Sequence, residues 1–440
     1  MLFCRRRIIV RIQPDSRPLY STNSPENTLK TAQIIRRFSF LEWGGTETVV
    51  WNTVHGLATE GMECEILATA ACDRAGQEER DGIRICRFPY FYPYWPMTAA
   101  RQEVLDKKGG NPFSPALRRH LQTADYDLLH VHNTGRLAEL VRMVSKQRKI
   151  PYIISFHGGF LDIPVDETRN MLAVLRGTLP YGGLFDRISG RKADVVSSAD
   201  GILCVGINEL EGLQARYPGK PILHLPNGVD PGLFRKKGSY DWREQLQLSS
   251  DCRLYLCVSR IDYQKNQLLL LRMMQRQREL GENSHLLLIG PLTVGWYAEQ
   301  IRQTIAKEHL ENRVTLCPGF PPNDERLIAA YQQAEVFFLP SLHEPFGIVV
   351  LEAWSAGLPV IASAVGGLKH LVHDGENGLL FKSDDLSSLL AACAKLAEPG
   401  VRQQLIRAAT KEVNTHYTWT VICQRLAEFY RVVKKQFVLS

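Results

Sequence analysis

The sequence predicts an α/β protein built from two Rossmann-like domains, each with a parallel sheet. Three observations lead to this fold class. The chain has 440 residues, which is more than one hydrophobic core usually serves. Short apolar runs alternate with longer amphipathic stretches, as in strands joined through helices in a parallel sheet. This alternation occurs twice, on either side of PNGVDPG at 226–232, whose Pro, Asn and Gly are typical of a linker.

The first series of runs predicts an N-terminal domain at residues 32–226. Its expected strands are short and apolar, and helical stretches separate most of them. They are AQIIRRFSF (32–40), CEILAT (64–69), GIRICRF (82–88), DLLHVH (127–132), PYIISF (151–156) and GILCVG (201–206).

The second series predicts a C-terminal domain at residues 227–416. An amphipathic segment, 417–435, follows it and is expected to form a final helix that packs on either domain. The expected strands of this domain are LYLCVS (254–259), HLLLIG (285–290), RVTLC (313–317), EVFFLP (335–340) and PVIAS (359–363).

Basic residues gather at the N-terminus. The formal net charge is +7, and residues 1–40 hold eight Arg or Lys against Asp15 and Glu26, so this stretch alone carries +6. The remaining chain is nearly neutral, and no nucleic-acid partner is predicted. Residues 1–31 are predicted to be a basic extension, which either contacts an anionic membrane surface or resembles a transit peptide.

The location predicted for the protein is the cytoplasm, with possible peripheral contact at the inner face of the cytoplasmic membrane. No apolar run approaches the ~20 residues that a membrane span needs. The ten cysteines include no CxxC pair, which favours a reducing compartment. Membrane contact is expected through Arg5–Arg7, Arg36, Arg37 or the aromatic, proline-rich loop FPYFYPYWP (88–96) around Trp95; a packed connection is the alternative for this loop.

The most informative motif is PSLHEPFGIVVLEAWSAGLPVIAS at 340–363. A helix beginning near Gly347 leaves the backbone N–H groups of Phe346, Gly347 and Ile348 free to bind a diphosphate. Glu344 lies just before this helix, where a carboxylate can accept from a sugar hydroxyl. Glu352, in the second helical turn, can accept from a ribose diol. Helix capping by Glu344 and an ordinary helical acid at Glu352 are the structural alternatives.

Two further strand ends carry candidate ligand-binding residues. VSRIDYQKNQ (258–267) places Arg260 and Lys265 after the first strand of the second domain, where ligands of open α/β sheets bind. WGGTE (43–47) follows the first strand of the chain, and Gly45 allows close approach of a ligand to the backbone. This segment is not GxGxxG, which disfavours a dinucleotide fold.

His157 in SFHGGF is a candidate ligand-facing histidine at a strand end, although a lone histidine is as often structural. The spacing of His130, His132 and His157 is not that of a zinc site. The acidic pair Asp125 and Asp127 precedes its strand instead of following it, so we predict a turn role for the pair and no metal site.

Together, GGTE, HVHNT, SFHGG, LPNGVD, SRIDYQKN and EPFGIVVLEAWSAGLPVIAS resemble, in order, the motifs of retaining GT-B glycosyltransferases of family 4. The resemblance covers about residues 32–435. It implies two Rossmann-like domains facing across a cleft, a donor on the C-terminal domain, an acceptor mainly on the N-terminal one, no cofactor and no required metal. It also implies that the final helix crosses back onto the N-terminal domain.

The resemblance also suggests roles for individual residues. Arg260 and Lys265 match the diphosphate clamp and Glu352 the ribose ligand, while Glu344 matches the sugar contact. Gly45 approaches the donor phosphates and His157 lines the reaction centre. The remaining donor contacts are Phe346, Gly347 and Ile348, with Gly319 and Phe320 as weaker candidates near the nucleobase.

The expected activity is transfer of a hexosyl unit, with retention, from a UDP- or GDP-sugar to a glycan or lipid-linked acceptor in cell-surface polysaccharide, lipopolysaccharide or glycolipid assembly. One alternative is another GT-B enzyme, such as a sugar-nucleotide epimerase or a disaccharide phosphorylase. The other is a catalytically silent subunit that only binds a sugar nucleotide. The sequence leaves the donor sugar, the acceptor and the linkage open.

Overall fold

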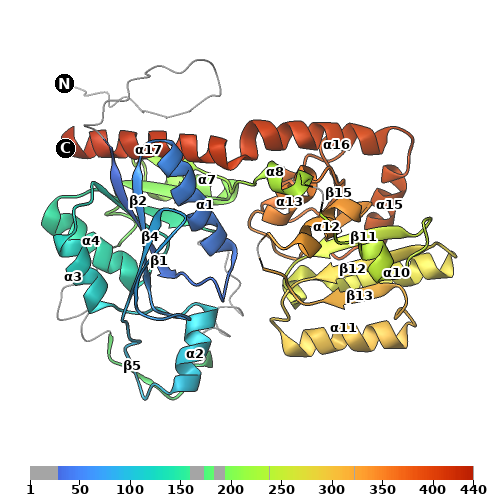
Figure 1. Cartoon of the computed structure of the whole chain (residues 1–440), viewed down its shortest axis with the longest axis horizontal. Helices are drawn as coiled ribbons and strands as arrows, with labels where there is room; N and C mark the ends of the chain where they lie inside the picture. Colours follow the sequence, from blue (N-terminus) through green and yellow to red (C-terminus); the bar gives the residue numbers. More distant parts are fainter. Residues whose placement is uncertain (1–27, 159–172, 183–193, 237, 322, 440) are drawn as a thin grey trace. The chain divides into compact units, whose positions relative to one another are not determined.

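The computed structural model describes residues 28–158, 173–182, 194–236, 238–321 and 323–439 (Figure 1). The chain divides into two compact units. Unit 1 comprises Met1–Leu225 together with Cys423–Ser440, and unit 2 comprises Pro226–Ile422. The chain therefore leaves the first unit, builds the second, and returns to the first for its last segment.

Unit 1 is built on an eight-stranded sheet in the order β10-β9-β7-β6-β1-β2-β4-β3. All neighbouring strands are parallel except β3, which pairs antiparallel with β4. The strands are β1 (Lys30–Arg37), β2 (Glu63–Thr69), β3 (Gly76–Arg80), β4 (Ile83–Phe88), β6 (Leu128–Val131), β7 (Tyr152–Phe156), β9 (Gly201–Cys204) and β10 (Ile222–His224).

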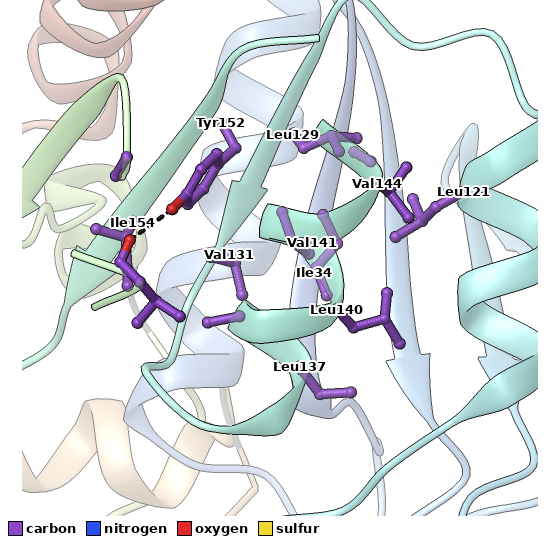
Figure 2. Packing of buried hydrophobic residues seen from close by; sticks show 14 of the residues in the cluster. Ile34, Leu121, Leu129, Val131, Leu137, Leu140, Val141, Val144, Tyr152 and Ile154 are labelled. Carbon is purple, nitrogen blue, oxygen red and sulfur yellow. Dashed lines mark hydrogen bonds between the residues drawn. The ribbon is translucent and has the colours of Figure 1, made fainter. Parts of the chain in front are cut away.

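Helices cover both faces of this sheet, because successive strand residues point to opposite sides. On one face, Ile34, Leu129 and Ile154 pack with α3 (Pro115–Thr123), α4 (Arg136–Arg148) and α7 (Ile207–Arg216). Figure 2 shows this cluster, with the hydroxyl of Tyr152 donating to the carbonyl of Val195 at 2.5 Å.

On the other face, Ile35, Leu128 and Ile153 pack with α1 (Gly45–Thr59) and with the last helix, α17 (Trp419–Leu439). The residues that α17 contributes to this core are Leu426, Ala427, Phe429, Tyr430 and Val433.

Unit 2 has a six-stranded, wholly parallel sheet in the order β13-β12-β11-β14-β15-β16. Its helices α10 (Gln267–Glu279), α11 (Gly295–Lys307) and α15 (Leu386–Leu396) share one core cluster with the sheet. Beside the opposite face, Tyr331 of α12 (Glu325–Gln333) stacks on Phe337. The strands are β11 (Arg253–Val258), β12 (Ser284–Ile289), β13 (Val314–Cys317), β14 (Val336–Leu339), β15 (Val360–Ser363) and β16 (Leu379–Phe381).

The first strand of each unit lies in the interior of its sheet. In unit 1 the chain starts at β1, adds strands on one side, and then crosses to the other side with β6. In unit 2 it starts at β11 and crosses with β14 in the same way. Loops leaving the carboxyl ends of such a strand pair diverge, and ligands of open α/β sheets bind in the space that results. The fold thus marks the ends of β1 and β6 in unit 1, and of β11 and β14 in unit 2.

The structure corrects several expected boundaries. Strand β1 begins at Lys30, so the last two residues assigned to the basic extension belong to the sheet; residues 1–27, including Arg5–Arg7, lie outside the described residues. Strand β3 was not expected because all five of its residues are exposed and it has no apolar pattern. The final helix runs to Leu439 instead of 435.

The aromatic loop at 88–96 contains both packed and exposed side chains. Tyr92 is buried and donates to Asp106 at 2.8 Å, whereas Trp95 is 67% exposed. Strand β5 (Tyr94–Trp95) pairs with β8 (Leu179–Pro180), and Leu179 is also exposed. No helix within the described ranges is long and apolar enough to cross a bilayer.

Candidate active site

An ion pair joins the two loops at the switch point of the unit 2 sheet. The ammonium of Lys265, after β11, lies 2.7 Å from Oε2 of Glu344, after β14, and each side chain is only 12% exposed. The same loops are linked by the backbone, because the Leu342 N–H donates to the Gln264 carbonyl at 2.7 Å. A cation and an anion are thus held together where a ligand is expected.

Arg260 lies on the same loop as Lys265 but is more accessible. Its side chain is half exposed, and Nη2 lies 3.2 Å from Oδ2 of the buried Asp262. The amide nitrogen of Gln267 donates to the Arg260 carbonyl at 2.8 Å and to Oγ of Ser259 at 2.9 Å, which fixes the turn. The guanidinium therefore has a defined base and keeps room to contact an anion.

The helix that follows Glu344, α13 (Ile348–Ser355), begins near Gly347 as the sequence predicts. It starts directly after Gly347, which has φ 96° and ψ 58°. The left-handed backbone angle favours glycine, and a Cβ on Gly347 would lie 2.8 Å from Cδ2 of Leu368, so that side chain would have to shift. The first N–H groups of a helix have no acceptor within it, and here they follow the loop that carries Glu344.

Glu352 lies in the second turn of α13. Its Oε2 accepts a 2.6 Å hydrogen bond from the hydroxyl of Tyr331. Burial raises the pKa of the Glu352 carboxyl above its ordinary value, and the Tyr331 hydroxyl partly offsets this rise. This hydrogen bond fixes one carboxylate oxygen and leaves the other with capacity to accept from a ligand hydroxyl.

The other donor candidates of unit 2 contact neighbouring side chains, and they are Phe346, Gly319 and Phe320. Phe346 is buried, with its ring 6.2 Å from that of Tyr417, so its contact with a donor would be through the backbone. Gly319 lies against Pro291, and a Cβ added to this glycine would lie only 2.9 Å from the proline Cδ. The ring of Phe320 lies under the guanidinium of Arg326, 4.4 Å from it.

In unit 1, a cavity of about 440 Å³ opens at the ends of β1 and β6. Gly45 is exposed at the start of α1 near this cavity, and open space lies where its Cβ would be. The cavity lining brings together residues from the β1 end, the β6 end and the loop before α3. They are Ile35, Arg36, Arg37, Thr46, Glu47, Gly109, Gly110, Asn111, Pro112, His132, Asn133, Thr134, Gly135 and Leu137.

The two arginines of this cavity, expected above to contact a membrane, make contacts within unit 1. Arg36 donates to the carbonyls of Leu105 and Asp106, and burial lowers the pKa of its guanidinium. Arg37 pairs with Glu47, with Nε 2.9 Å from Oε1. Both arginines also line the cavity.

His157 is connected to this cavity through His132. Nδ1 of His132 lies 2.9 Å from Nε2 of His157, and the rings stack with an interplanar angle of 17°. Nδ1 of His157 is buried and has no hydrogen-bond partner among the residues that the structure describes. Burial lowers the pKa of His157 to about 4 and that of His132 well below its ordinary value, so both imidazoles are neutral at pH 7.

Comparisons with known proteins find matches for both units. The family model for glycosyl transferases group 1 matches residues 239–412, and that for glycosyltransferase family 4 matches residues 43–233. A D-inositol 3-phosphate glycosyltransferase of Thermomonospora curvata is 31% identical over 325 residues, which are 70% of this chain and 72% of that protein. The chain belongs to the glycosyltransferases of group 1 and family 4.

Solved structures share the GT-B fold of the family. Sucrose-phosphate synthase of Thermosynechococcus elongatus superposes with a TM-score of 0.68 at 22% identity, over 94% of this chain and all of that one. Anabaena HepE in complex with UDP and glucose superposes with a TM-score of 0.66 at 16% identity, over 92% of this chain and all of that one.

Sequence reasoning missed several residues that support the candidate site of this glycosyltransferase. Tyr331, Asp262 and Gln267 each bind a candidate residue or its backbone, but nothing in their local sequence indicates a ligand. Gly366 and Gly367 had a detectable signal, since paired glycines mark close approach. A Cβ on either would lie within 2.3 Å of the backbone oxygen of Glu344 or Pro345.

The structure also brings together histidines that sequence spacing keeps apart. His132 and His157 are 25 residues apart in sequence and become neighbours because β6 pairs with β7. Across the described ranges, no group of three or more His, Cys, Asp or Glu side chains is arranged to hold a metal ion. Asp127 of the acidic pair accepts from the Lys30 N–H at 2.9 Å, at the entry of its strand.

Proposed function

We propose that the protein is a retaining glycosyltransferase that moves a hexosyl unit from a UDP- or GDP-sugar to a glycan or lipid-linked acceptor in cell-surface polysaccharide assembly. The observation that carries this proposal is the Lys265–Glu344 ion pair at the switch point of the unit 2 sheet. Its cation suits a diphosphate, and its carboxylate suits a sugar hydroxyl. This combination matches a nucleotide sugar better than a simple nucleotide.

The charge that develops on the departing diphosphate needs stabilisation, and unit 2 supplies it without a metal. Lys265 and Arg260 provide positive charge, and the start of α13 provides unpaired N–H groups. Glu352 takes the ribose hydroxyls through its second oxygen. We therefore propose that turnover requires neither a metal nor another cofactor.

Retention of configuration follows from a front-face substitution in this proposal. In this proposal Glu344 binds Lys265 and a sugar hydroxyl, while Glu352 binds Tyr331 and the ribose, so neither carboxylate is assigned as a nucleophile. The acceptor hydroxyl instead attacks from the face that the diphosphate leaves, and its proton passes to the departing phosphate. His157 accepts a hydrogen bond from a sugar hydroxyl at the reaction centre.

The acceptor site in this proposal is the 440 Å³ cavity of unit 1. A second acceptor class, a small phosphorylated polyol, is favoured by one specific observation. Two arginines and one glutamate line the cavity, which leaves an excess positive charge, and Asn133 and Thr134 add hydrogen-bonding groups. The relative named as a D-inositol 3-phosphate glycosyltransferase is consistent with this class.

We also propose peripheral membrane contact through the exposed side chains of β5 and β8. Trp95 and Leu179 are each about two-thirds exposed on paired strands, which suits insertion at a lipid interface. Co-sedimentation with phosphatidylglycerol vesicles, lost in a Trp95→Ser, Leu179→Ser double variant, would support the contact. Equal sedimentation of the variant and the parent would exclude this surface.

The first test of the proposed function is thermal unfolding against UDP, GDP and ADP and their sugars, because a ligand of the native state raises the midpoint. The expected result is a rise with one base that Glu352→Ala abolishes. Incubation with the matching sugar nucleotide and an acceptor then gives the anomeric configuration of the product by NMR. The absence of any shift would favour a silent subunit, and turnover without an acceptor would favour an epimerase.

A further inference from the structure

A continuous chain of hydrogen bonds runs through the core of unit 1 and ends at His157. From that residue inward, the donor–acceptor distances are 2.9, 2.9, 3.0, 2.5 and 2.5 Å. In order, its members are His157, His132, Gln33, Tyr430, His130 and Ser155.

Four structural elements that are distant in sequence supply this chain. Gln33 lies on β1, His130 on β6 and Ser155 on β7, while Tyr430 lies on α17, 300 residues beyond His130. Every member inward of His157 is less than 8% exposed. Such a buried polar chain persists only because each member satisfies the next, so their hydrogen-bonding directions are coupled.

The carboxamide of Gln33 determines the direction of the half that leads to His157. Its oxygen faces Nε2 of His132 and its nitrogen donates to the hydroxyl of Tyr430. An amide oxygen only accepts, so Nε2 of His132 carries the proton. Burial lowers the pKa of this imidazole, so it is neutral and its Nδ1 is an acceptor.

The same reasoning extends by one residue to the ligand-facing end. Since Nδ1 of His132 accepts, the proton between the two rings belongs to Nε2 of His157. His157 is neutral as well, so its Nδ1 carries a lone pair. This is the buried nitrogen that has no partner among the described residues.

Tyr430 joins the amide of Gln33 to the deeper half of the chain. Its hydroxyl accepts from Gln33 and donates to Nδ1 of His130, whose Nε2 donates in turn to Ser155. Turning the amide by 180° would require every bond of the chain to reverse together. A single hydroxyl on α17 thus couples the amide to the deeper half of the chain.

We propose that Gln33 and Tyr430 are positioning residues that fix His157 as the Nε2–H tautomer, with Nδ1 available to accept a hydrogen bond from a substrate hydroxyl. The inference rests on the proposed function for the identity of that substrate. The opposite tautomer would present an N–H and would favour a phosphate or carbonyl oxygen instead. The chain therefore selects a hydroxyl-bearing sugar at this position.

The tautomer can be observed directly by imidazole ¹⁵N–¹H correlation NMR of the histidine-labelled full chain without ligand. The expected result is a protonated Nε2 and an unprotonated Nδ1 at His157, assigned by comparison with His157→Gln. A protonated Nδ1 in the parent protein would overturn the proposal. This measurement requires no turnover, so it fails or succeeds independently of the proposed function.

Tyr430→Phe tests the coupling, since it removes only the hydroxyl that links the amide of Gln33 to His130. We expect His157 to become a mixture of tautomers and kcat to fall about twofold or more, in proportion to the lost population, with the KM for the donor unchanged. The matched control is Tyr152→Phe, which removes another buried tyrosine hydroxyl of unit 1 outside the chain. A single unchanged tautomer in Tyr430→Phe would overturn the role of Tyr430.

Gln33→Leu provides a second variant that removes the amide altogether. Its expected result is the same mixture at His157, whereas Tyr152→Phe keeps the parent spectrum. Nucleotide-induced stabilisation, which reports on unit 2, should be the same in all of these variants. If no nucleotide stabilises the parent protein, the proposed function is contradicted, but the tautomer result still stands.

Discussion

The hydroxyl of Tyr331 donates a 2.6 Å hydrogen bond to Oε2 of Glu352, and it thereby stabilises the charged form of a carboxyl whose pKa burial raises. Removing the hydroxyl raises this pKa further, because one stabilising donor is lost. Only the carboxylate accepts from both ribose hydroxyls in our proposal. The pH at which nucleotide binding is lost on acidification is therefore linked to Tyr331.

Tyr331→Phe is expected to shift the acid limb of nucleotide binding to higher pH. Nucleotide affinity measured by calorimetry between pH 4.5 and 8 checks this expectation. Tyr255→Phe removes another buried hydroxyl of unit 2 and serves as the control. Superimposable pH profiles for Tyr331→Phe and the parent would contradict the assigned role of Glu352.

Lys265→Ala and Arg260→Ala should each lower turnover by about 10²-fold or more, because each removes positive charge from the departing diphosphate. Steady-state kinetics with the donor identified by thermal unfolding measures this effect. Lys395→Ala, which removes a half-exposed lysine 3.9 Å from Asp374, should leave turnover unchanged. Near-parental rates in both variants would contradict the proposed role of Lys265 and Arg260 in stabilising the departing diphosphate.

Gly347→Ala should destabilise the chain by about 1–2 kcal/mol, because its backbone is left-handed, and should also weaken nucleotide binding. The second effect arises because the new Cβ contacts Leu368 and moves the start of α13. Gly357→Ala isolates the first effect, since φ is 73° there and the nearest atom to a Cβ is 4.0 Å away. Equal nucleotide affinity in the two variants would separate the α13 start from the donor site.

The buried histidines of unit 1 predict a loss of stability at mildly acid pH. The folded pKa of His130 is about 3 and that of His157 about 4, whereas an unfolded histidine has a pKa of about 6.5. The unfolded state thus binds more protons below pH 6.5. The free energy of unfolding should fall by up to about 1.4 kcal/mol per pH unit for each such histidine as the pH decreases from 6.5 toward 4.

Urea unfolding at pH 7.5, 6.5 and 5.5 measures this slope. His132→Gln should reduce it, whereas His373→Gln, at a half-exposed position, should not. A free energy of unfolding that is constant over this range would mean that the three imidazoles are hydrated in the folded state.

Chelation provides a further test of the donor site. Dialysis against EDTA should leave turnover unchanged, because Lys265, Arg260 and the start of α13 neutralise the diphosphate in our proposal. Metal content of the dialysed protein, measured by mass spectrometry, is the control. A loss of turnover that Mg²⁺ or Mn²⁺ restores would contradict metal independence.

The parallel-sheet fold could be predicted because its strands are buried on both faces and read as short apolar runs. Strand β3 could not, since its residues are exposed and its position depends on pairing with β4. The loops that carry Lys265 and Glu344 could be located because charged residues follow apolar runs there, with proline and glycine around Glu344. Their mutual contact depends on β11 lying beside β14, which local sequence does not encode.

The hydrogen-bond chain from His157 to Ser155 also could not be predicted from local sequence. Each of its members looks like an isolated polar residue in an apolar run, and spacing gave no reason to connect them. They meet because strand register aligns Val131 with Ile154, which places His132 and His157 at the same edge of the sheet. Tyr430 completes the chain from the opposite end of the sequence, where amphipathic periodicity predicts a helix but not its partner.

Helix α17 also affects the order in which the two units can complete folding during translation. Its segment from Cys423 onward belongs to the core of unit 1, yet it is translated after all of unit 2. The nascent N-terminal unit therefore waits for the whole of Pro226–Ile422 with part of its apolar sheet face uncovered. Transient chaperone binding to that face, and aggregation of chains truncated before Cys423, are the expected cellular signs of this delay.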